Sequence, residues 1–123
     1  MKNQDKVFLI VDDEPDMCWA LENILKRKGF CSKKASNGRE ALEFVKQNHF
    51  RLVFLDAKLP DMEGLQLAKK IRDFDPLVPI VIVSGYFYRD DTDILNAQKK
   101  GSINDFIAKP FSHNEVMKVI EGL

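Results

Sequence analysis

The stretch Val7-Phe8-Leu9-Ile10-Val11-Asp12-Asp13 joins five apolar residues directly to two aspartates. An uninterrupted apolar run of this length predicts a strand that is buried on both faces, as in a parallel sheet covered by helices on either side. The two carboxylates would then lie just beyond the carboxyl end of that strand. The stretch therefore predicts both the kind of sheet and the edge of the sheet where polar side chains collect.

Short apolar segments alternate with helical patterns along the rest of the chain. Further strands are predicted at residues 30–35, 52–55, 79–83 and 106–108, although the centre of the first, Ser32-Lys33-Lys34, is polar. Helices are predicted between the strands and after the last one, around residues 17–25, 39–48, 64–74 and 91–100 and from Ser112 onward. Five strands alternating with five helices predict a single α/β domain over residues 1–123, built on a doubly wound parallel sheet.

The apolar positions of the first and last helices predict which of their faces are buried. The stripe of the first helix comprises Met17, Ala20, Leu21, Ile24 and Leu25. Cys18 and Trp19 fall off this stripe, and Trp19 is expected either as a partly covered surface residue or as a docking contact for a partner. The stripe of the last helix comprises Val116, Val119, Ile120 and Leu123.

Composition and charge exclude several classes of protein. The chain has 19 basic and 19 acidic side chains and no net formal charge, so direct binding of nucleic acid or of anionic membranes is not expected. Cys18 and Cys31 form neither a metal-binding spacing nor a disulfide framework, which is typical of reduced thiols in a cytoplasmic protein. No apolar run approaches the ~20 residues that span a bilayer. A cytoplasmic domain is therefore predicted.

Polar residues follow four of the predicted strands. They are Asp12-Asp13, Asp56, Ser84 and Lys109. If the strands are parallel, these side chains project toward one crevice, where each pair of carboxylates would repel by roughly 3 kcal/mol at ~6 Å and an effective dielectric constant near 20. A compensating cation is needed, and the candidates are Lys109 and a hard divalent metal with oxygen ligands, usually Mg²⁺.

Such a crevice suits phosphoryl transfer to an aspartate. A carboxylate can attack phosphorus to form an acyl phosphate, and catalysis is then mainly positioning and neutralisation of charge. A metal ion, the Lys109 ammonium and the Ser84 hydroxyl could each take one phosphoryl oxygen. Each residue alone has an ordinary alternative, since Asp12-Asp13 could cap a helix and Lys109 could be a solvated loop residue.

The combined motifs resemble the receiver domain of bacterial two-component response regulators over nearly the whole chain. The matching segments are Val11-Asp12-Asp13-Glu14-Pro15, Asp56 with Leu59-Pro60-Asp61-Met62-Glu63-Gly64, Val83-Ser84-Gly85 and Lys109-Pro110-Phe111. The resemblance implies a flavodoxin-like, CheY-like (βα)5 fold. It also implies a phosphoacceptor switch rather than an enzyme, taking its phosphoryl group from a sensor histidine kinase or a histidine phosphotransfer protein.

The same resemblance implies a role for each residue of the crevice. Asp56 would be the phosphorylation site, and Mg²⁺ would be bound by Asp13, Asp56 and the Lys58 backbone carbonyl with help from Asp12. Ser84 and Lys109 would contact phosphoryl oxygens, with a cis peptide bond between Lys109 and Pro110. Phe106 would be the switch aromatic that accompanies Ser84, although the sequence is also compatible with a core residue there.

The segment between Ser84 and Lys109 departs from the family pattern because it is longer and carries Tyr86-Phe87-Tyr88. We expect these aromatics either on a surface loop or in a dimer or effector contact through the 85–111 region.

Two other functions compete with a phosphorylation switch. A phosphatase of the haloacid dehalogenase type would need a second aspartate two residues after its nucleophile, which the adjacent Asp12-Asp13 pair does not provide. The second alternative is a degenerate receiver that acts as a phosphorylation-independent interaction module.

Overall fold

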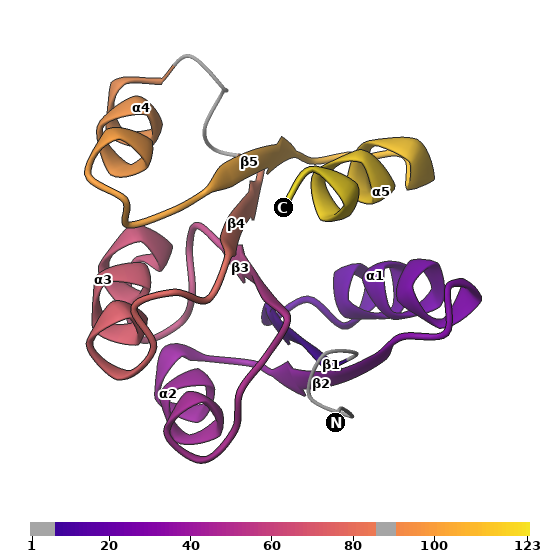
Figure 1. Cartoon of the computed structure of the whole chain (residues 1–123), viewed down its shortest axis with the longest axis horizontal. Helices are drawn as coiled ribbons and strands as arrows, with labels where there is room; N and C mark the ends of the chain where they lie inside the picture. The colour runs from indigo at the N-terminus through magenta and orange to yellow at the C-terminus, as the bar shows by residue number, and fades with distance from the viewer. Residues whose placement is uncertain (1–6, 86–90) are drawn as a thin grey trace.

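The computed structural model describes residues 7–85 and 91–123 of the chain. Within these ranges, strands and helices alternate (Figure 1). They are β1 (Val7–Val11), α1 (Pro15–Arg27), β2 (Cys31–Ala35), α2 (Gly38–Gln47), β3 (Leu52–Asp56), α3 (Gly64–Phe74), β4 (Ile80–Ser84), α4 (Thr92–Lys99), β5 (Asp105–Ala108) and α5 (His113–Gly122). The strands form one sheet in the order β2-β1-β3-β4-β5, and all neighbouring pairs are parallel. The predicted doubly wound, flavodoxin-like fold is confirmed.

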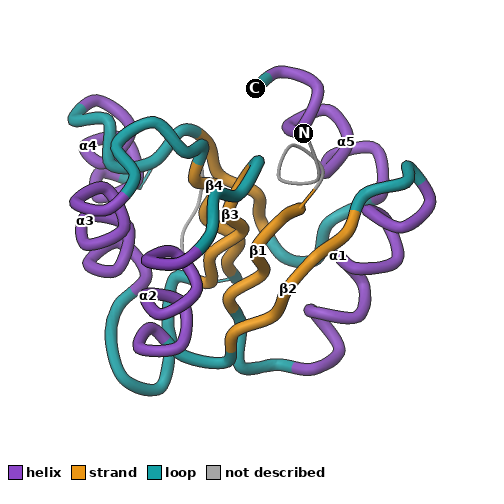
Figure 2. The backbone as a smooth tube through the Cα atoms, turned by 60° about the horizontal axis from the view of Figure 1, so that its bottom comes forward, coloured by secondary structure: helices purple, strands orange, loops and turns teal. Residues whose placement is uncertain are grey.

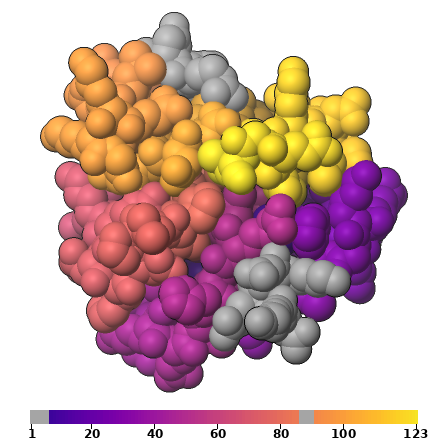
Figure 3. Space-filling model, viewed as in Figure 1, coloured from indigo at the N-terminus to yellow at the C-terminus, as the bar shows by residue number. Residues whose placement is uncertain are grey.

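Helices cover both faces of the sheet. Helices α1 and α5 lie on one face, and α2, α3 and α4 lie on the other (Figures 1 and 2). The space-filling view shows the same division, with α1 in purple beside α5 in yellow and α2 to α4 stacked along the opposite flank (Figure 3). Successive strand residues enter different layers, so that Phe54 packs toward α1 and α5 while Leu55 packs toward α2, α3 and α4.

The burial of each strand explains its sequence. Every residue of β3 and β4 is buried because these strands have neighbours on both sides and helices on both faces. Strand β2 lies at the edge of the sheet and pairs only with β1, which leaves Lys33 and Lys34 exposed. The polar strand predicted at residues 30–35 is therefore confirmed, and its composition follows from its edge position.

Two predictions about buried helix faces are wrong. Cys18 is 5% exposed and belongs to the apolar layer beneath α1, where it lies one turn from Leu21 and behaves as a small apolar side chain. Leu123 is 46% exposed because α5 ends at Gly122, one residue earlier. Trp19 lies on the surface as predicted, with 67% of its area exposed.

The strand order determines where the polar residues meet. The chain moves from β1 outward to β2 and then returns to the other side of β1 to form β3. Ligand sites of open parallel sheets lie beyond the carboxyl ends of the strands at this kind of reversal. Asp12 and Asp13 follow β1 and Asp56 ends β3, so the fold brings these carboxylates to the same point.

Candidate functional site

Three carboxylates meet at the carboxyl ends of β1 and β3. One oxygen from each of Asp12, Asp13 and Asp56 lies within 4.8 Å of the other two. Asp12 and Asp56 are 4% and 6% exposed, whereas Asp13 is open to solvent. The sequence prediction of one acidic crevice is thereby confirmed for these three residues.

Local hydrogen bonds hold Asp12 in this crevice. Its backbone N–H donates to the Ala35 carbonyl oxygen at 3.0 Å, which continues the pairing of β1 with β2 by one residue. Its side-chain Oδ1 accepts from the Glu14 N–H at 2.9 Å, and its carbonyl oxygen accepts from the Cys18 Sγ at 3.4 Å. The buried cysteine therefore has a structural role next to the crevice.

Lys109 places one positive charge among the crowded carboxylates. Its Nζ lies 3.0 Å from Asp12 Oδ2, 3.0 Å from Glu14 Oε1 and 3.6 Å from Asp56 Oδ1. The peptide bond between Lys109 and Pro110 is cis, as the family resemblance implied. The ion pair with Glu14 was not predicted; the only signal in the sequence was an acidic residue directly after Asp12-Asp13.

The electrostatics of the crevice favour an added cation. Burial, and then the charge of Asp12, raise the pKa of Asp56 to about 6, against the smaller opposing effect of Lys109. Burial alone would lower the pKa of Lys109, but its hydrogen bonds to Glu14 and Asp12 raise it overall. The ammonium therefore stays charged, while one lysine faces four acidic side chains counting Glu14 and Asp13.

Ser84 and Phe106 lie on the neighbouring strands. Ser84 ends β4 and is completely buried, and its carbonyl oxygen accepts from the Lys109 N–H at 3.0 Å. Phe106, on β5, is 1% exposed and packs into the layer beneath α2, α3 and α4. The ring is thus directed inward, and its part in switching remains a prediction.

A pocket of about 250 Å³ opens beside the carboxylates. It is lined by Asp12, Asp13, Pro15, Cys18, Lys34, Ala35, Ser36 and Glu40. Asp13 thereby borders an open space, which agrees with the exposure of its side chain. Carboxylate oxygens are the donors that hard divalent cations prefer, so the residues present fit such an ion.

The family model of the response regulator receiver domain matches residues 8–121. The chain belongs to this family. A receiver domain is a phosphoacceptor switch of two-component signalling rather than a true enzyme. In this chain, the cluster of Asp12, Asp13 and Asp56 is typical of a receiver's Mg²⁺ site.

Relatives of this receiver domain support the assignment. The transcriptional regulatory protein SrrA of Staphylococcus aureus is 36% identical over 116 residues, which cover 94% of this chain and 46% of SrrA. The chain thus spans about half the length of the curated relatives that it matches. The whole regulator's output therefore does not transfer to this chain.

Two solved structures share the fold. A response regulator from Burkholderia pseudomallei, described with a phosphorylated aspartic acid, a calcium ion and citrate, is 25% identical, with a TM-score of 0.82 over 94% of this chain and 66% of that one. The receiver domain of the sensor histidine kinase PA1611 from Pseudomonas aeruginosa, described with a magnesium ion in its active-site cleft, is 22% identical, with a TM-score of 0.83 over 95% of each chain.

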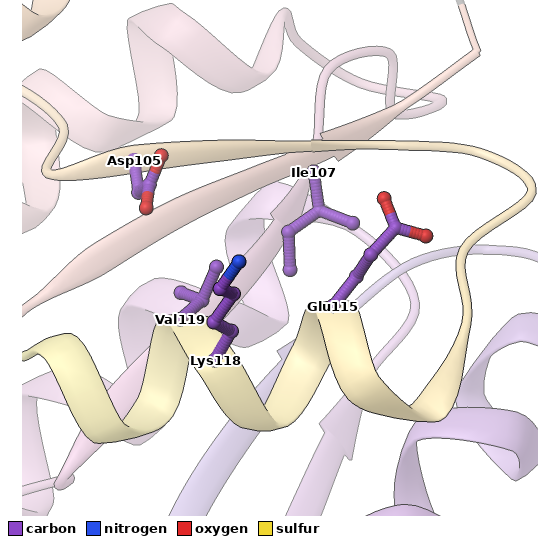
Figure 4. Close-up of a pocket in the computed structure, with 5 residues that line it drawn as sticks. All are labelled: Asp105, Ile107, Glu115, Lys118 and Val119. Atoms are coloured by element: carbon purple, nitrogen blue, oxygen red, sulfur yellow. The ribbon is translucent and has the colours of Figure 1, made fainter.

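The region 85–111 of this receiver domain is described only in part. Tyr86, Phe87 and Tyr88 lie outside the described residues. In the described part, Leu95 is 48% exposed, and a groove of about 280 Å³ runs between β5 and α5. Asp105 and Ile107 of β5 face Glu115, Lys118 and Val119 of α5 across it (Figure 4). A dimer or effector contact through this region remains a prediction.

Membrane insertion was not expected from the sequence. Among the described helices of this receiver domain, none has the length and the hydropathy required to cross a bilayer.

Proposed function

We propose that Asp56 accepts a phosphoryl group from a phosphohistidine on a sensor histidine kinase or a histidine phosphotransfer protein. The observation that carries the proposal is the meeting of a buried Asp56 with Asp12, Asp13 and Lys109 at one end of the sheet. The family membership of the chain supports the same function.

The proposed reaction is a direct transfer between the two side chains. A carboxylate oxygen of Asp56 attacks phosphorus and forms a P–O bond as the P–N bond to the donor imidazole breaks. The electron pair of the broken bond stays on the imidazole nitrogen, and Asp56 becomes an aspartyl phosphate. The incoming phosphoryl group brings further negative charge into a site that already has an excess of carboxylates, so charge compensation controls the rate.

Mg²⁺ is the proposed cofactor. Asp13, Asp56 and the Lys58 backbone carbonyl would hold it, assisted by Asp12. When bound, it supplies positive charge that offsets the charge of the phosphoryl oxygens. The tight grouping of three carboxylate oxygens supports this assignment.

Lys109 and Ser84 complete the proposed site. The Lys109 ammonium, already within 3.6 Å of Asp56 Oδ1, moves from Asp12 and Glu14 toward a phosphoryl oxygen. The Ser84 hydroxyl contacts another oxygen, and the buried Phe106 ring repacks as the end of β4 adjusts. These movements would pass the signal to an output domain or partner.

Labelling with a small phosphodonor tests the function. Incubation with acetyl phosphate and Mg²⁺ should add one phosphoryl group to the wild-type protein, detected by intact-mass spectrometry. The label should be absent in Asp56→Asn and retained in Asp73→Asn, which neutralises an exposed aspartate on α3. A folded wild-type protein that takes no label from either acetyl phosphate or a phosphohistidine donor would instead favour the phosphorylation-independent interaction module.

A further inference from the structure

The loop between β3 and α3 is hydrogen-bonded to the start of α2. The proposed phosphorylation chemistry does not use this contact. Asp61 Oδ1 accepts from the Gly38 N–H at 2.8 Å, and Asp61 Oδ2 accepts from the Arg39 N–H at 3.0 Å. The same loop contains Lys58, whose backbone carbonyl is a proposed metal ligand. The start of α2 and the proposed cation site therefore share one connecting segment.

Asp61 supplies hydrogen-bond acceptors that α2 lacks on its own. A helix leaves its first four N–H groups without partners inside the helix. In α2 the third is capped by Asn37 Oδ1, which accepts from Glu40 at 2.8 Å, and the fourth donates to the Asn37 carbonyl oxygen. The first two, of Gly38 and Arg39, bind Asp61. The positive end of the helix dipole also favours a carboxylate at this position.

Packing strengthens the same attachment. A Cβ atom on Gly38 would lie 2.6 to 2.7 Å from the Met62 side chain, so the absence of a side chain lets Met62 approach the first turn of α2. Met62 is partly buried against the apolar layer on this face of the sheet. The loop therefore touches α2 through two consecutive residues, one polar and one apolar.

Hydrogen bonds inside the loop connect Asp61 to the phosphoacceptor. Lys58 and Glu63 form an antiparallel bridge, and the Leu59 N–H donates to the Met62 carbonyl oxygen at 3.1 Å. The backbone N–H of Lys58 in turn donates to the Asp56 carboxylate. The loop is thus a closed turn, in which backbone hydrogen bonds link the residues on either side of Asp61 to Lys58.

Gly64 closes the far end of this turn. Its N–H donates to the Ala57 carbonyl oxygen at 2.7 Å, and a Cβ atom at this position would overlap the carbonyl oxygen of Asp56. The two ends of the segment from Asp56 to Gly64 are consequently held together, and Asp61 in its middle is held by the hydrogen bonds to α2.

We propose that Asp61 is a positioning residue for the cation site: by binding the first two N–H groups of α2, it holds the β3–α3 loop in the conformation that places the Lys58 backbone beside Asp56. The proposal rests on the proposed function, since it assumes that the cation binds at Asp13, Asp56 and Lys58. It assigns no contact between Asp61 and the metal.

Mg²⁺ affinity, measured by following backbone amide signals in NMR titrations, tests the proposal. Residues that orient metal ligands typically change affinity by 10-fold or more, so Asp61→Ala is expected to raise the Kd for Mg²⁺ about 10-fold and to shift the Lys58 amide signal before Mg²⁺ is added. Asp61→Asn keeps one acceptor oxygen and should give an intermediate Kd. If Asp61→Ala does not fold, Asp61→Asn alone is compared with wild type, and an unchanged Kd in that variant overturns the proposal.

The matched control is Asn37→Ala, which removes the cap that α2 supplies for itself and leaves the β3–α3 loop attached. It should lower stability but keep the Kd within twofold of wild type. An unchanged Kd in Asp61→Ala overturns the proposal, as does an equal loss in Asn37→Ala, which would indicate general weakening of α2. Equal losses in Asp61→Asn and Asp61→Ala would also overturn it, because they would indicate a long-range effect of charge.

Asp13→Asn separates the proposal from the function on which it rests. If Asp13→Asn abolishes Mg²⁺ binding while Asp61→Ala leaves it unchanged, the cation site stands and the positioning role is wrong. If Asp13→Asn leaves Mg²⁺ binding intact, the proposed cation site itself is wrong, and the positioning role is refuted with it.

Discussion

In the metal-free protein, Asp56→Asn is expected to stabilise the fold at neutral and alkaline pH, although it removes the proposed phosphoacceptor. The reason is the electrostatic environment of the Asp56 carboxylate, which is 6% exposed and shares its crevice with Asp12. Burial and the Asp12 charge both disfavour the ionised form of Asp56. Asparagine is nearly the same size, keeps an acceptor for the Lys58 N–H and carries no charge.

The size and sign of the effect follow from the pKa of Asp56. The folded protein raises this pKa from 3.8 to about 6, so the folded state holds the proton more tightly than the unfolded state. The associated stability is present below pH 3.8 and is lost as the pH rises through about 6. A difference of about 2 pKa units corresponds to about 3 kcal/mol, which is an upper limit because the variant also loses the attraction of Lys109. We expect about 1–3 kcal/mol.

Urea unfolding in the presence of EDTA, followed by far-ultraviolet circular dichroism, measures this effect. The free energies of unfolding of Asp56→Asn and wild type should be similar near pH 4 and should separate in favour of the variant by pH 8. Adding Mg²⁺ should stabilise wild type more than the variant, because the variant has lost one of the proposed ligands. Asp73→Asn, on the exposed surface of α3, is the control for loss of one negative charge.

Two results would refute this reasoning. One is a variant that is less stable than wild type at pH 8 in EDTA, which would show that the pairing with Lys109 outweighs burial and repulsion. The other is a stability difference that does not change between pH 4 and pH 8, which would show that the Asp56 carboxylate is not the group responsible.

Three further substitutions have expected outcomes in the same unfolding assay. Lys109→Met should destabilise the metal-free protein by about 2–4 kcal/mol at pH 8 because it leaves the buried carboxylates uncompensated; a loss that Mg²⁺ does not reduce would contradict this. Arg72→Lys should lower the free energy of unfolding by about 1–3 kcal/mol, because the guanidinium donates to the Gly101 carbonyl oxygen at 3.0 Å and to Asn104 Oδ1 at 2.9 Å. It should also speed amide exchange near Asn104, and unchanged exchange there would argue against this role. Ser112→Ala should cost about 1 kcal/mol by breaking the capping box of α5, and a neutral effect would show that solvent replaces the cap.

The strands and helices were predictable because their signals are local. The apolar run Val7–Val11 and the buried β3 and β4 show the burial expected for central parallel strands. The errors concern the burial of residues at the edge of a helix face or at the end of a helix, where a shift of one position decides whether a side chain is buried. Cys18 was placed off the buried face because it lies beside the apolar stripe of α1. Leu123 was placed on the buried face because the apolar period continues past the residue where α5 ends.

The grouping of the acidic residues was predictable in part. Parallel strands place their carboxyl ends at one edge, so Asp12, Asp13 and Asp56 could be brought together from the sequence. Which residue would compensate their charge could not be decided in this way. Lys109 reaches Glu14, 95 positions away in the chain, and the loop geometry that permits this contact has no local signature.

The sequence by itself therefore determined the order of strands and helices, the kind of sheet and the identities of the crevice residues, because periodicity and motif spacing depend on near neighbours along the chain. The tertiary structure decided the raised pKa of Asp56, the sharing of Lys109 with Glu14 and the attachment of Asp61 to α2, across 23 residues to Gly38. Each of these depends on burial and on distances between segments, and those quantities exist only once the layers have packed.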